Sequence, residues 1–178
     1  AKIEDANGLS KCLQEYFQTK QQTHWKMHTL FNSEMDSLLK YVTFVPEQII
    51  DWKEAIRVAF QPLLEHHFVR EQYVEQIIRL NETKGNYMFL GKGVLLAHAK
   101  PEDGVLSLSV AVALCRGTVP LGNGKDVKCI RCWAPINQTS HLDFLAMLLQ
   151  HINEDDWCNK LYQMKTQNEL EAFLLEAF

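Results

Sequence analysis

The sequence has 178 residues, of which 47% are hydrophobic and 22% are charged, and its formal net charge at pH 7 is -4. This length and apolar content suffice for one substantial core with an appended segment. The acidic balance argues against direct nucleic-acid contact, which usually requires a clustered basic surface. No stretch approaches the roughly 18 uninterrupted apolar residues of a membrane-spanning helix, and the N-terminus lacks the pattern of a signal peptide. The sequence therefore predicts a cytoplasmic protein without membrane insertion.

The N-terminal part differs from the rest of the chain in its pattern of apolar and polar residues. An apolar run at helical spacing gives way to a polar stretch over residues 18–23, which predicts a short helix followed by a linker. We therefore divide the chain into an N-terminal helix and linker at residues 1–33, interpreted as the tail of a preceding domain, and a compact domain at residues 34–178. The start at Ala1 without an initiator Met suggests a fragment or a processed chain.

Two amphipathic helices are expected early in the domain. In the first, apolar residues recur at helical spacing from Trp52 to Leu63, with Asp51 as a plausible N-cap and Pro62 near the end. The second runs from about Arg70 to Leu80 and buries one apolar face.

The centre of the domain favours strands, and its C-terminal part is helical again. The expected strands cover residues 86–97, 105–114 and 127–133, separated by segments rich in Gly and Pro. Apolar stripes at helical spacing follow over residues 142–149, 157–164 and 170–178. Helices before and after a strand-rich centre predict an α/β fold, a three-layer sandwich with helices on both faces of the sheet.

Several sequence motifs suggest other functions, but their residues do not have the spacing or the context that those functions require. Residues 117–125 resemble a phosphate loop, but Asp126 stands where Ser or Thr should follow the Lys, and residues 91–93 lead into a strand rather than a helix. Cys129 and Cys132 are three apart in an expected strand, so they point to opposite faces, and no second cysteine pair exists. We interpret these two as semi-buried structural thiols, and the five cysteines of the chain as reduced.

The remaining histidine pairs also have ordinary interpretations. His24 and His28 have helical spacing but no third metal ligand nearby, which indicates solvated side chains. His66 and His67 follow the end of the first expected helix, where a cation is mildly favourable.

After these exclusions, His98 and His141 remain as the candidate functional residues. His98 closes an expected strand and opens the loop 99–104, where a rigid element meets solvent. His141 follows Thr139 and Ser140, which are good N-caps, and so falls in the first turn of an expected helix. Unpaired backbone N–H groups gather there and favour a bound anion. A second imidazole beside that anion site could donate to a phosphoryl oxygen.

Four segments in order resemble the fructose/mannitol/ascorbate-type enzyme IIA domains of the bacterial phosphotransferase system (PTS). They are Trp52-Lys53-Glu54-Ala55-Ile56, Tyr73-Val74-Glu75, the run from Leu96 through His98 to Val105, and Ser140-His141-Leu142. The resemblance covers about residues 34–178 and implies a mixed sheet with helices on both faces. It implies that His98 accepts phosphate from the phosphocarrier HPr and passes it to a cysteine of a IIB domain. His141 would support the transfer.

The resemblance also implies chemistry without a metal or other cofactor. A neutral imidazole is nucleophilic near pH 7, and its phosphoramidate stays energetic enough for onward transfer. Lys100 and Ser140 are supporting candidates. The family's Pro before the active histidine is Ala97 here, and Arg79 is the nearest counterpart of an arginine found in many members.

Alternatives remain open at this stage. Domains of this type occur as transport components, which can associate with a membrane IIC component, and as C-terminal modules of transcription regulators. In the second setting His98 and His141 could sense or structure a PTS-protein interface without catalysis. A third alternative is a metal hydrolase that uses both histidines with Asp103 or Asp143. The sequence does not name the sugar.

Overall fold

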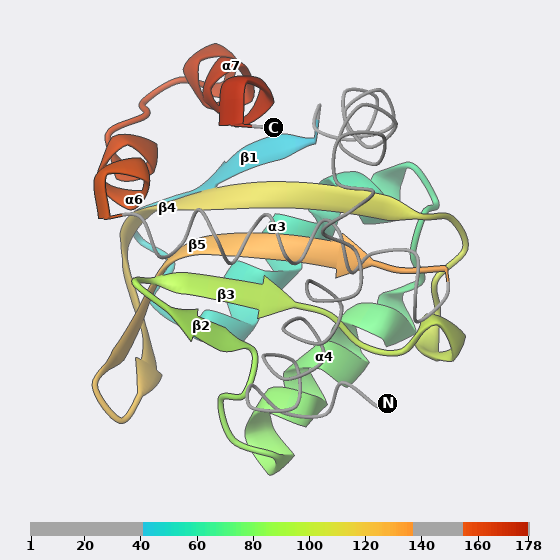
Figure 1. Ribbon diagram of the computed structural model, residues 1–178. Coiled ribbons are helices and arrows are strands. Elements are labelled where there is room, and N and C mark those ends of the chain that lie inside the picture. Colours follow the sequence, from blue (N-terminus) through green and yellow to red (C-terminus); the bar gives the residue numbers. More distant parts are fainter. Residues whose placement is uncertain (1–40, 137–154, 178) are drawn as a thin grey trace, which may run out of the picture.

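The structure is a computed structural model that describes residues 41–136 and 155–177 (Figure 1). The strands are β1 (Val42–Val45), β2 (Phe89–Gly91), β3 (Val94–Ala97), β4 (Ser109–Gly122) and β5 (Lys125–Ala134). The helices are α3 (Trp52–Glu65), α4 (Glu71–Thr83), the short 3-10 helix η2 (Pro101–Asp103), α6 (Asp155–Tyr162) and α7 (Gln167–Ala177).

The strands form one mixed five-stranded sheet in the order β1-β4-β5-β3-β2. The pairs β1–β4 and β3–β5 are parallel, whereas β4–β5 and β2–β3 are antiparallel. The register of β3 with β5 brings Leu96 opposite Arg131 and Ala97 opposite Cys132. This arrangement confirms the mixed sheet that the resemblance implied.

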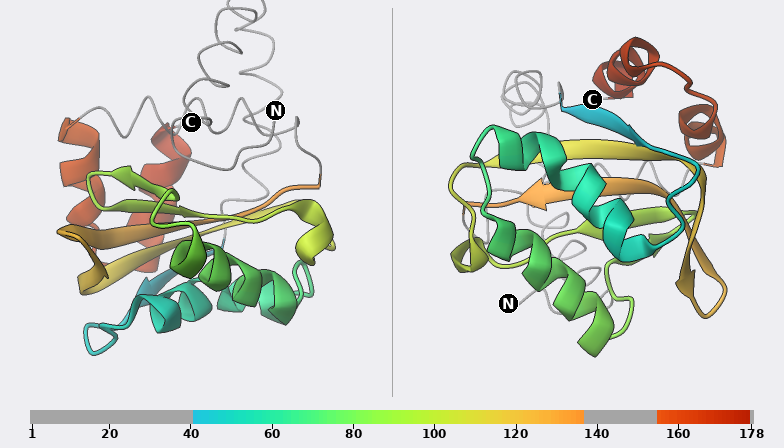
Figure 2. Two further views of the ribbon diagram at one scale, coloured as in Figure 1. Left: turned by 90° about the horizontal axis from the view of Figure 1, so that it is seen from below. Right: turned by 180° about the vertical axis from the view of Figure 1, so that it is seen from behind.

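Helices α3 and α4 cover one face of the sheet, while α6 and α7 lie on its other side near β1 and the far end of β4 (Figure 2). Alternation along the strands divides the side chains between these two faces. Leu95, Ala97 and Cys132 pack in the core beneath α3 and α4. Leu96 and Arg131 are also buried, but they alternate to the opposite face. The predicted α/β sandwich is confirmed.

The two early helices form where the N-cap and the amphipathic spacing in the sequence predicted them. The Asp51 carboxylate accepts a hydrogen bond from the Lys53 N–H at 3.1 Å and caps α3. The helix continues past Pro62 to Glu65, two residues beyond the predicted run that ended at Leu63. Arg70 occupies the N-cap position of α4, and the buried side chains of this helix are Tyr73, Val74, Ile77, Ile78 and Asn81.

The strand boundaries differ from the prediction in three places. Residues 86–97 do not form one strand, because Gly91, Lys92 and Gly93 all adopt positive φ and turn the chain between β2 and β3. The strand β4 begins at Ser109 rather than at residue 105 and continues through Pro120, so that Asn123 and Gly124 form a tight turn to β5. The short strand β1 was not predicted at all.

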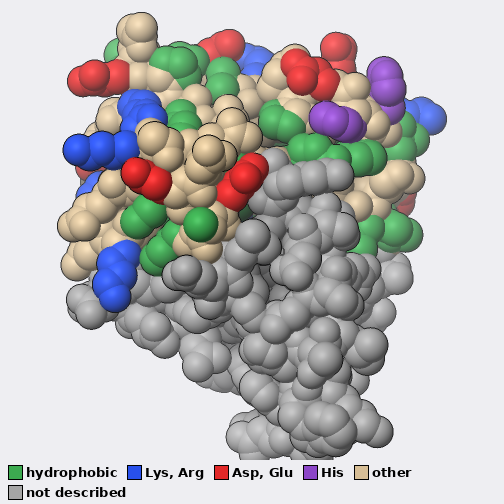
Figure 3. All heavy atoms as spheres, turned by 90° about the horizontal axis from the view of Figure 1, so that it is seen from above, with side chains coloured by type: hydrophobic (Ala, Val, Ile, Leu, Met, Phe, Trp, Pro, Cys, Tyr) green, Lys and Arg blue, Asp and Glu red, His purple; other side chains and the backbone are tan. Residues whose placement is uncertain are grey.

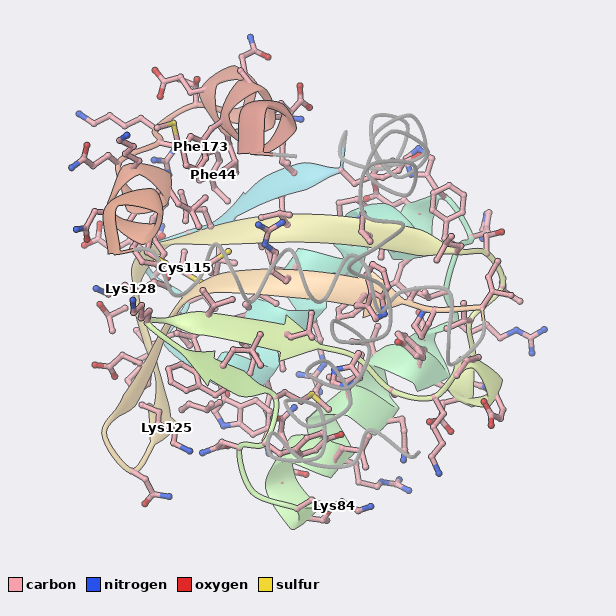
Figure 4. All side chains as sticks on the ribbon, viewed as in Figure 1. Phe44, Lys84, Cys115, Lys125, Lys128 and Phe173 are labelled. Atoms are coloured by element: carbon pink, nitrogen blue, oxygen red, sulfur yellow. The ribbon has the colours of Figure 1, made fainter. Side chains whose placement is uncertain are left out.

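The C-terminal helices are attached at the edge of the sheet where β3 begins. The Tyr162 hydroxyl donates to the Lys92 carbonyl, and the Arg116 guanidinium donates to the Lys165 carbonyl. The same guanidinium lies over the Phe44 ring of β1 at 3.8 Å from its centroid. Figure 4 shows Phe44 and Phe173 between β1 and α7, which are in contact. Both helices agree with the predicted apolar stripes at 157–164 and 170–178.

The predicted domain boundary near residue 34 and the predicted helix at 142–149 lie outside the described residues. Within residues 41–136 and 155–177, no helix is long and apolar enough to cross a membrane.

Candidate functional site

His98 is the first residue after β3, at the edge of the sheet where the parallel strands β3 and β5 both end. Its side chain is half-buried, between the fully buried Ala97 and the buried Ala99. The sequence correctly placed His98 at a strand end, where the sheet fixes the backbone and the next residues are free to form a loop.

The ring of His98 is held in one orientation by its own strand. Its Nδ1 lies 2.9 Å from the Leu96 carbonyl oxygen, a contact in which the ring N–H donates. A histidine whose Nδ1 carries the proton leaves its Nε2 lone pair available. The Tyr87 ring meets the imidazole edge-on, with centroids 6.1 Å apart. The geometry therefore leaves Nε2 as the ring nitrogen with an available lone pair.

Burial also favours the neutral form of this ring. Desolvation lowers the pKa of His98, and the hydrogen bond to Leu96 opposes that shift to a smaller extent. A neutral imidazole near pH 7 is the form with nucleophilic character.

The loop after His98 is tied to the start of α4. The Arg70 N–H donates to the Gly104 carbonyl at 2.9 Å, and the Leu106 N–H donates to the Phe68 carbonyl at 2.8 Å. Gly104 has a φ of 134°, and a Cβ there would meet the Tyr73 backbone nitrogen at 3.2 Å. Only glycine allows this close approach without strain. The loop is consequently a fixed element rather than an open connection.

Of the supporting residues predicted from the sequence, Lys100 and Arg79 lie on different elements of the structure. Lys100 belongs to the His98 loop, where its side chain is exposed and its backbone N–H donates to the Asp103 carboxylate at 3.1 Å. Arg79 is exposed on α4, beyond the turn that contacts the loop. Ser140 and His141 lie outside the described residues. Lys100 is two residues from His98 in the chain, and in the described part neither Lys100 nor Arg79 makes a hydrogen bond or ion pair with His98.

The metal-hydrolase alternative used Asp103 as a possible metal ligand. In the structure the Asp103 carboxylate caps η2 by accepting a hydrogen bond from the Lys100 N–H. Among the described residues no group of three or more His, Cys, Asp or Glu side chains could hold a metal ion.

Arg131 is a residue that the sequence reasoning missed. It lies in β5 opposite Leu96 and is only 2% exposed. Burial lowers its pKa, with a smaller opposing effect from Cys129. The signal was present in the sequence, because Arg131 is the one charged residue in the run 129–134 and shares a strand face with Cys129 and Trp133, which is unusual for a cation.

The two strand cysteines point to opposite faces, as predicted, but they are fully rather than partly buried. Cys132 packs in the core beneath the helices, whereas Cys129 does not belong to that core. Burial raises the pKa of Cys129 to about 11 and that of Cys132 well above its ordinary range. Neither thiol is suited to nucleophilic chemistry.

His66 and His67 are the other histidines of the described part. Both are exposed, and His66 forms the C-cap of α3, with its Nδ1 at 2.8 Å from the Pro62 carbonyl. Its ring stacks on Phe68, with centroids 5.5 Å apart. Figure 3 shows histidine side chains beside hydrophobic ones on one corner of the surface. Their position after a helix end agrees with the interpretation from the sequence.

Within residues 41–136 and 155–177, the structure is a mixed α/β sandwich with one oriented, half-buried histidine at a strand end. Residues 37–177 match the family model "Phosphoenolpyruvate-dependent sugar phosphotransferase system, EIIA 2". The chain belongs to this family, whose members are phosphotransferase components of the IIA type.

Individual relatives agree with this assignment. The chain is 26% identical over 121 residues to the mannitol-specific cryptic phosphotransferase enzyme IIA component of Escherichia coli K12, covering 67% of this chain and 82% of that protein. A PTS IIA (PtxA) crystal structure from Streptococcus mutans matches with a TM-score of 0.69 at 24% identity, over 83% of this chain and 93% of that one. The Escherichia coli complex of enzyme IIAMTL and phosphorylated enzyme IIBMTL matches with a TM-score of 0.62 at 19% identity, over 75% and 94% of the two chains.

Proposed function

We propose that this chain is a phosphoryl carrier of the PTS that accepts phosphate from HPr on His98 and passes it to a cysteine of a IIB partner. The observation that carries the proposal is the orientation of His98, whose Nδ1 contacts the Leu96 carbonyl and whose Nε2 is left without a proton. The membership in the EIIA 2 family supports it. The cytoplasm is the compartment that this role requires.

The chemistry is an in-line transfer between two nucleophiles. The Nε2 lone pair attacks the phosphorus of the phosphorylated donor, so that a new N–P bond forms while the bond from phosphorus to the donor breaks. The phosphoryl group then transfers to a thiolate of the partner: an S–P bond forms while the N–P bond breaks, and its electron pair returns to Nε2, which restores the neutral imidazole. Positioning and electrostatic stabilisation supply most of the rate in such transfers. His141 and Lys100 are the residues we propose to contact phosphoryl oxygens.

The IIB partner is supported by one of the structural relatives. The protein in that Escherichia coli structure is an enzyme IIA in complex with a phosphorylated enzyme IIB. We infer that the His98 edge of the sheet is the face that this chain presents to its own donor and acceptor.

The runner-up is a regulatory module that binds PTS proteins without turnover. Ala97 favours it, because an alanine restricts the backbone before His98 less than the proline of the family does. In the structure Ala97 is fully buried and paired with Cys132, so the ladder takes over part of this restriction.

The test is incubation with phosphoenolpyruvate, enzyme I and HPr, followed by intact-mass measurement. We expect one acid-labile phosphoryl adduct that is absent from His98→Gln. The matched control is His66→Gln, because His66 has the same contact between Nδ1 and a backbone carbonyl but lies on the exposed end of α3. An unchanged mass together with specific retention of HPr would favour the regulatory module, and an adduct that persists in His98→Gln would refute the assignment of His98.

A further inference from the structure

Tyr73 lies at the start of α4 and is completely buried against the end of the sheet. Its hydroxyl accepts a hydrogen bond from the Ala99 N–H at 3.0 Å and donates one to the Trp133 carbonyl at 2.5 Å. Ala99 directly follows His98, and Trp133 is the residue before the end of β5. One hydroxyl therefore links the backbones at the ends of two parallel strands.

Both backbone groups belong to buried residues. Ala99 and Trp133 are 7% and 4% exposed, so water has little access to them. A buried N–H or C=O that loses its hydrogen bond costs about 1–3 kcal/mol. The hydroxyl satisfies one group of each kind, which only a group that both donates and accepts can do.

We propose that Tyr73 is a positioning residue for His98, one that fixes the backbone just after the histidine so that its Nδ1 stays on the Leu96 carbonyl and its Nε2 faces the phosphodonor. The proposal rests on the function proposed above. The segment around His98 is then held on both sides, since the Leu96 N–H donates at 2.9 Å to the carbonyl of Met88, the residue before β2.

The Tyr73 side chain is enclosed by its surroundings, and its hydroxyl also lies 3.4 Å from the Ala99 carbonyl, a longer contact than the one to Trp133. Its ring packs edge-on against Phe60, with centroids 5.9 Å apart, and Gly104 closes over its backbone. Burial raises the pKa of the Tyr73 hydroxyl far above the physiological range. The hydroxyl therefore keeps its proton, and both hydrogen bonds persist, at every pH at which the protein functions.

The test compares Tyr73→Phe with Tyr162→Phe. Each variant removes one hydroxyl that donates to a backbone carbonyl and keeps the aromatic ring, but Tyr162 contacts Lys92 at the opposite edge of the sheet. Two quantities are measured: the rate of phosphoryl transfer from phosphorylated HPr, resolved into kcat and KM, and the tautomer of His98 from the ¹⁵N shifts of its ring, assigned by comparison with His98→Gln.

We expect Tyr73→Phe to lower kcat about tenfold with KM changed less than twofold, because small displacements of a reacting group have large effects on rate. We also expect the fraction of the Nδ1-protonated tautomer to fall. Tyr162→Phe should leave both quantities unchanged. A tautomer and a kcat in Tyr73→Phe equal to those of the wild type would overturn the proposal.

The tautomer is measured on the unphosphorylated protein, so it tests the positioning role even if His98 proves not to accept phosphate. A wild-type protein without phosphoryl transfer refutes the proposed function alone, whereas an unchanged tautomer in Tyr73→Phe refutes the positioning role alone. Thermal unfolding of both variants fixes a temperature at which each is folded, and the spectra are compared there.

Discussion

His98 and the two cysteines of β5, Cys129 and Cys132, are residue types that can act as nucleophiles, and burial affects that ability in opposite ways. In each case desolvation favours the uncharged form: it lowers the pKa of His98 and raises the pKa of Cys129 and Cys132. For an imidazole the uncharged form is the nucleophile, whereas for cysteine it is the inert thiol. The same physical cause thus activates one residue and silences the other two.

Position along the strand completes the contrast. Cys132 lies opposite Ala97 within the ladder, and its side chain has no route to a partner protein. His98 comes one residue after Ala97, where the strand ends and the side chain reaches half-buried surroundings. A single step along the chain separates a buried position in the ladder from the proposed phosphoryl acceptor.

The largest effect should come from placing a thiol at the reactive position. In His98→Cys we expect phosphoryl acceptance from HPr to fall at least about 100-fold, because burial there favours the thiol over the thiolate. The rate is measured by rapid quench and compared with His98→Gln as the zero level. A cysteine variant that accepts phosphate within tenfold of the wild type would show that burial does not control reactivity at this position.

The pH dependence gives the next test. The pKa of His98 is lowered in the folded protein, so below about pH 6.5 the unfolded state binds more protons at this site than the native state. The contribution of His98 to the free energy of unfolding is therefore fully present above pH 6.5 and is lost as the pH falls below that value. We expect an NMR titration of the ring with a midpoint below 6.5.

The same linkage can be checked on stability. Between pH 7 and pH 5, the free energy of unfolding from urea titrations should fall more steeply for the wild type than for His98→Gln, which lacks the titrating group. Equal slopes in the two proteins, or a ring midpoint above 6.5, would contradict the assignment of His98 as a desolvated, neutral imidazole.

The buried cysteine thiols of β5 should react slowly in the native protein. In a Cys12→Ser background, we expect Cys129 and Cys132 to react with a disulfide reagent at pH 8 at least about 100-fold more slowly in the native protein than in urea. Cys115, which is partly exposed with a pKa raised to about 12, should also react slowly. Labelling sites are identified by peptide mass. Fast labelling of Cys132 in the native state would show that β5 opens readily beside His98.

Much of this comparison was accessible from the sequence. The alternation of β5 predicted that Cys129 and Cys132 face opposite ways, and the step from an apolar strand into a Pro- and Gly-containing loop placed His98 at a strand end. Both inferences depend on local periodicity, which a single sequence contains.

The parts that were missed depend on contacts between distant segments. The extension of β4 through Pro120 is set by pairing with β5, which local propensity does not reveal. Tyr73 entered the sequence analysis as part of a resemblance, but its two hydrogen bonds join residues 26 and 60 positions away. For Arg131 the sequence held a signal, a cation among apolar neighbours, but its nearly complete burial is set by the assembled sheet.

The smallest effect is expected for Cys132→Ala, with Cys129→Ala as the matched variant on the opposite face. Removing the Cys132 sulfur leaves a small void among Ala97 and its core neighbours and should lower the free energy of unfolding by about 1 kcal/mol. Phosphoryl acceptance should stay within twofold of the wild type, because the thiol faces α3 and α4 and does not contact the His98 ring. If acceptance instead falls tenfold at unchanged stability, the thiol takes part in the chemistry, and burial cannot be what separates His98 from the cysteines beside it.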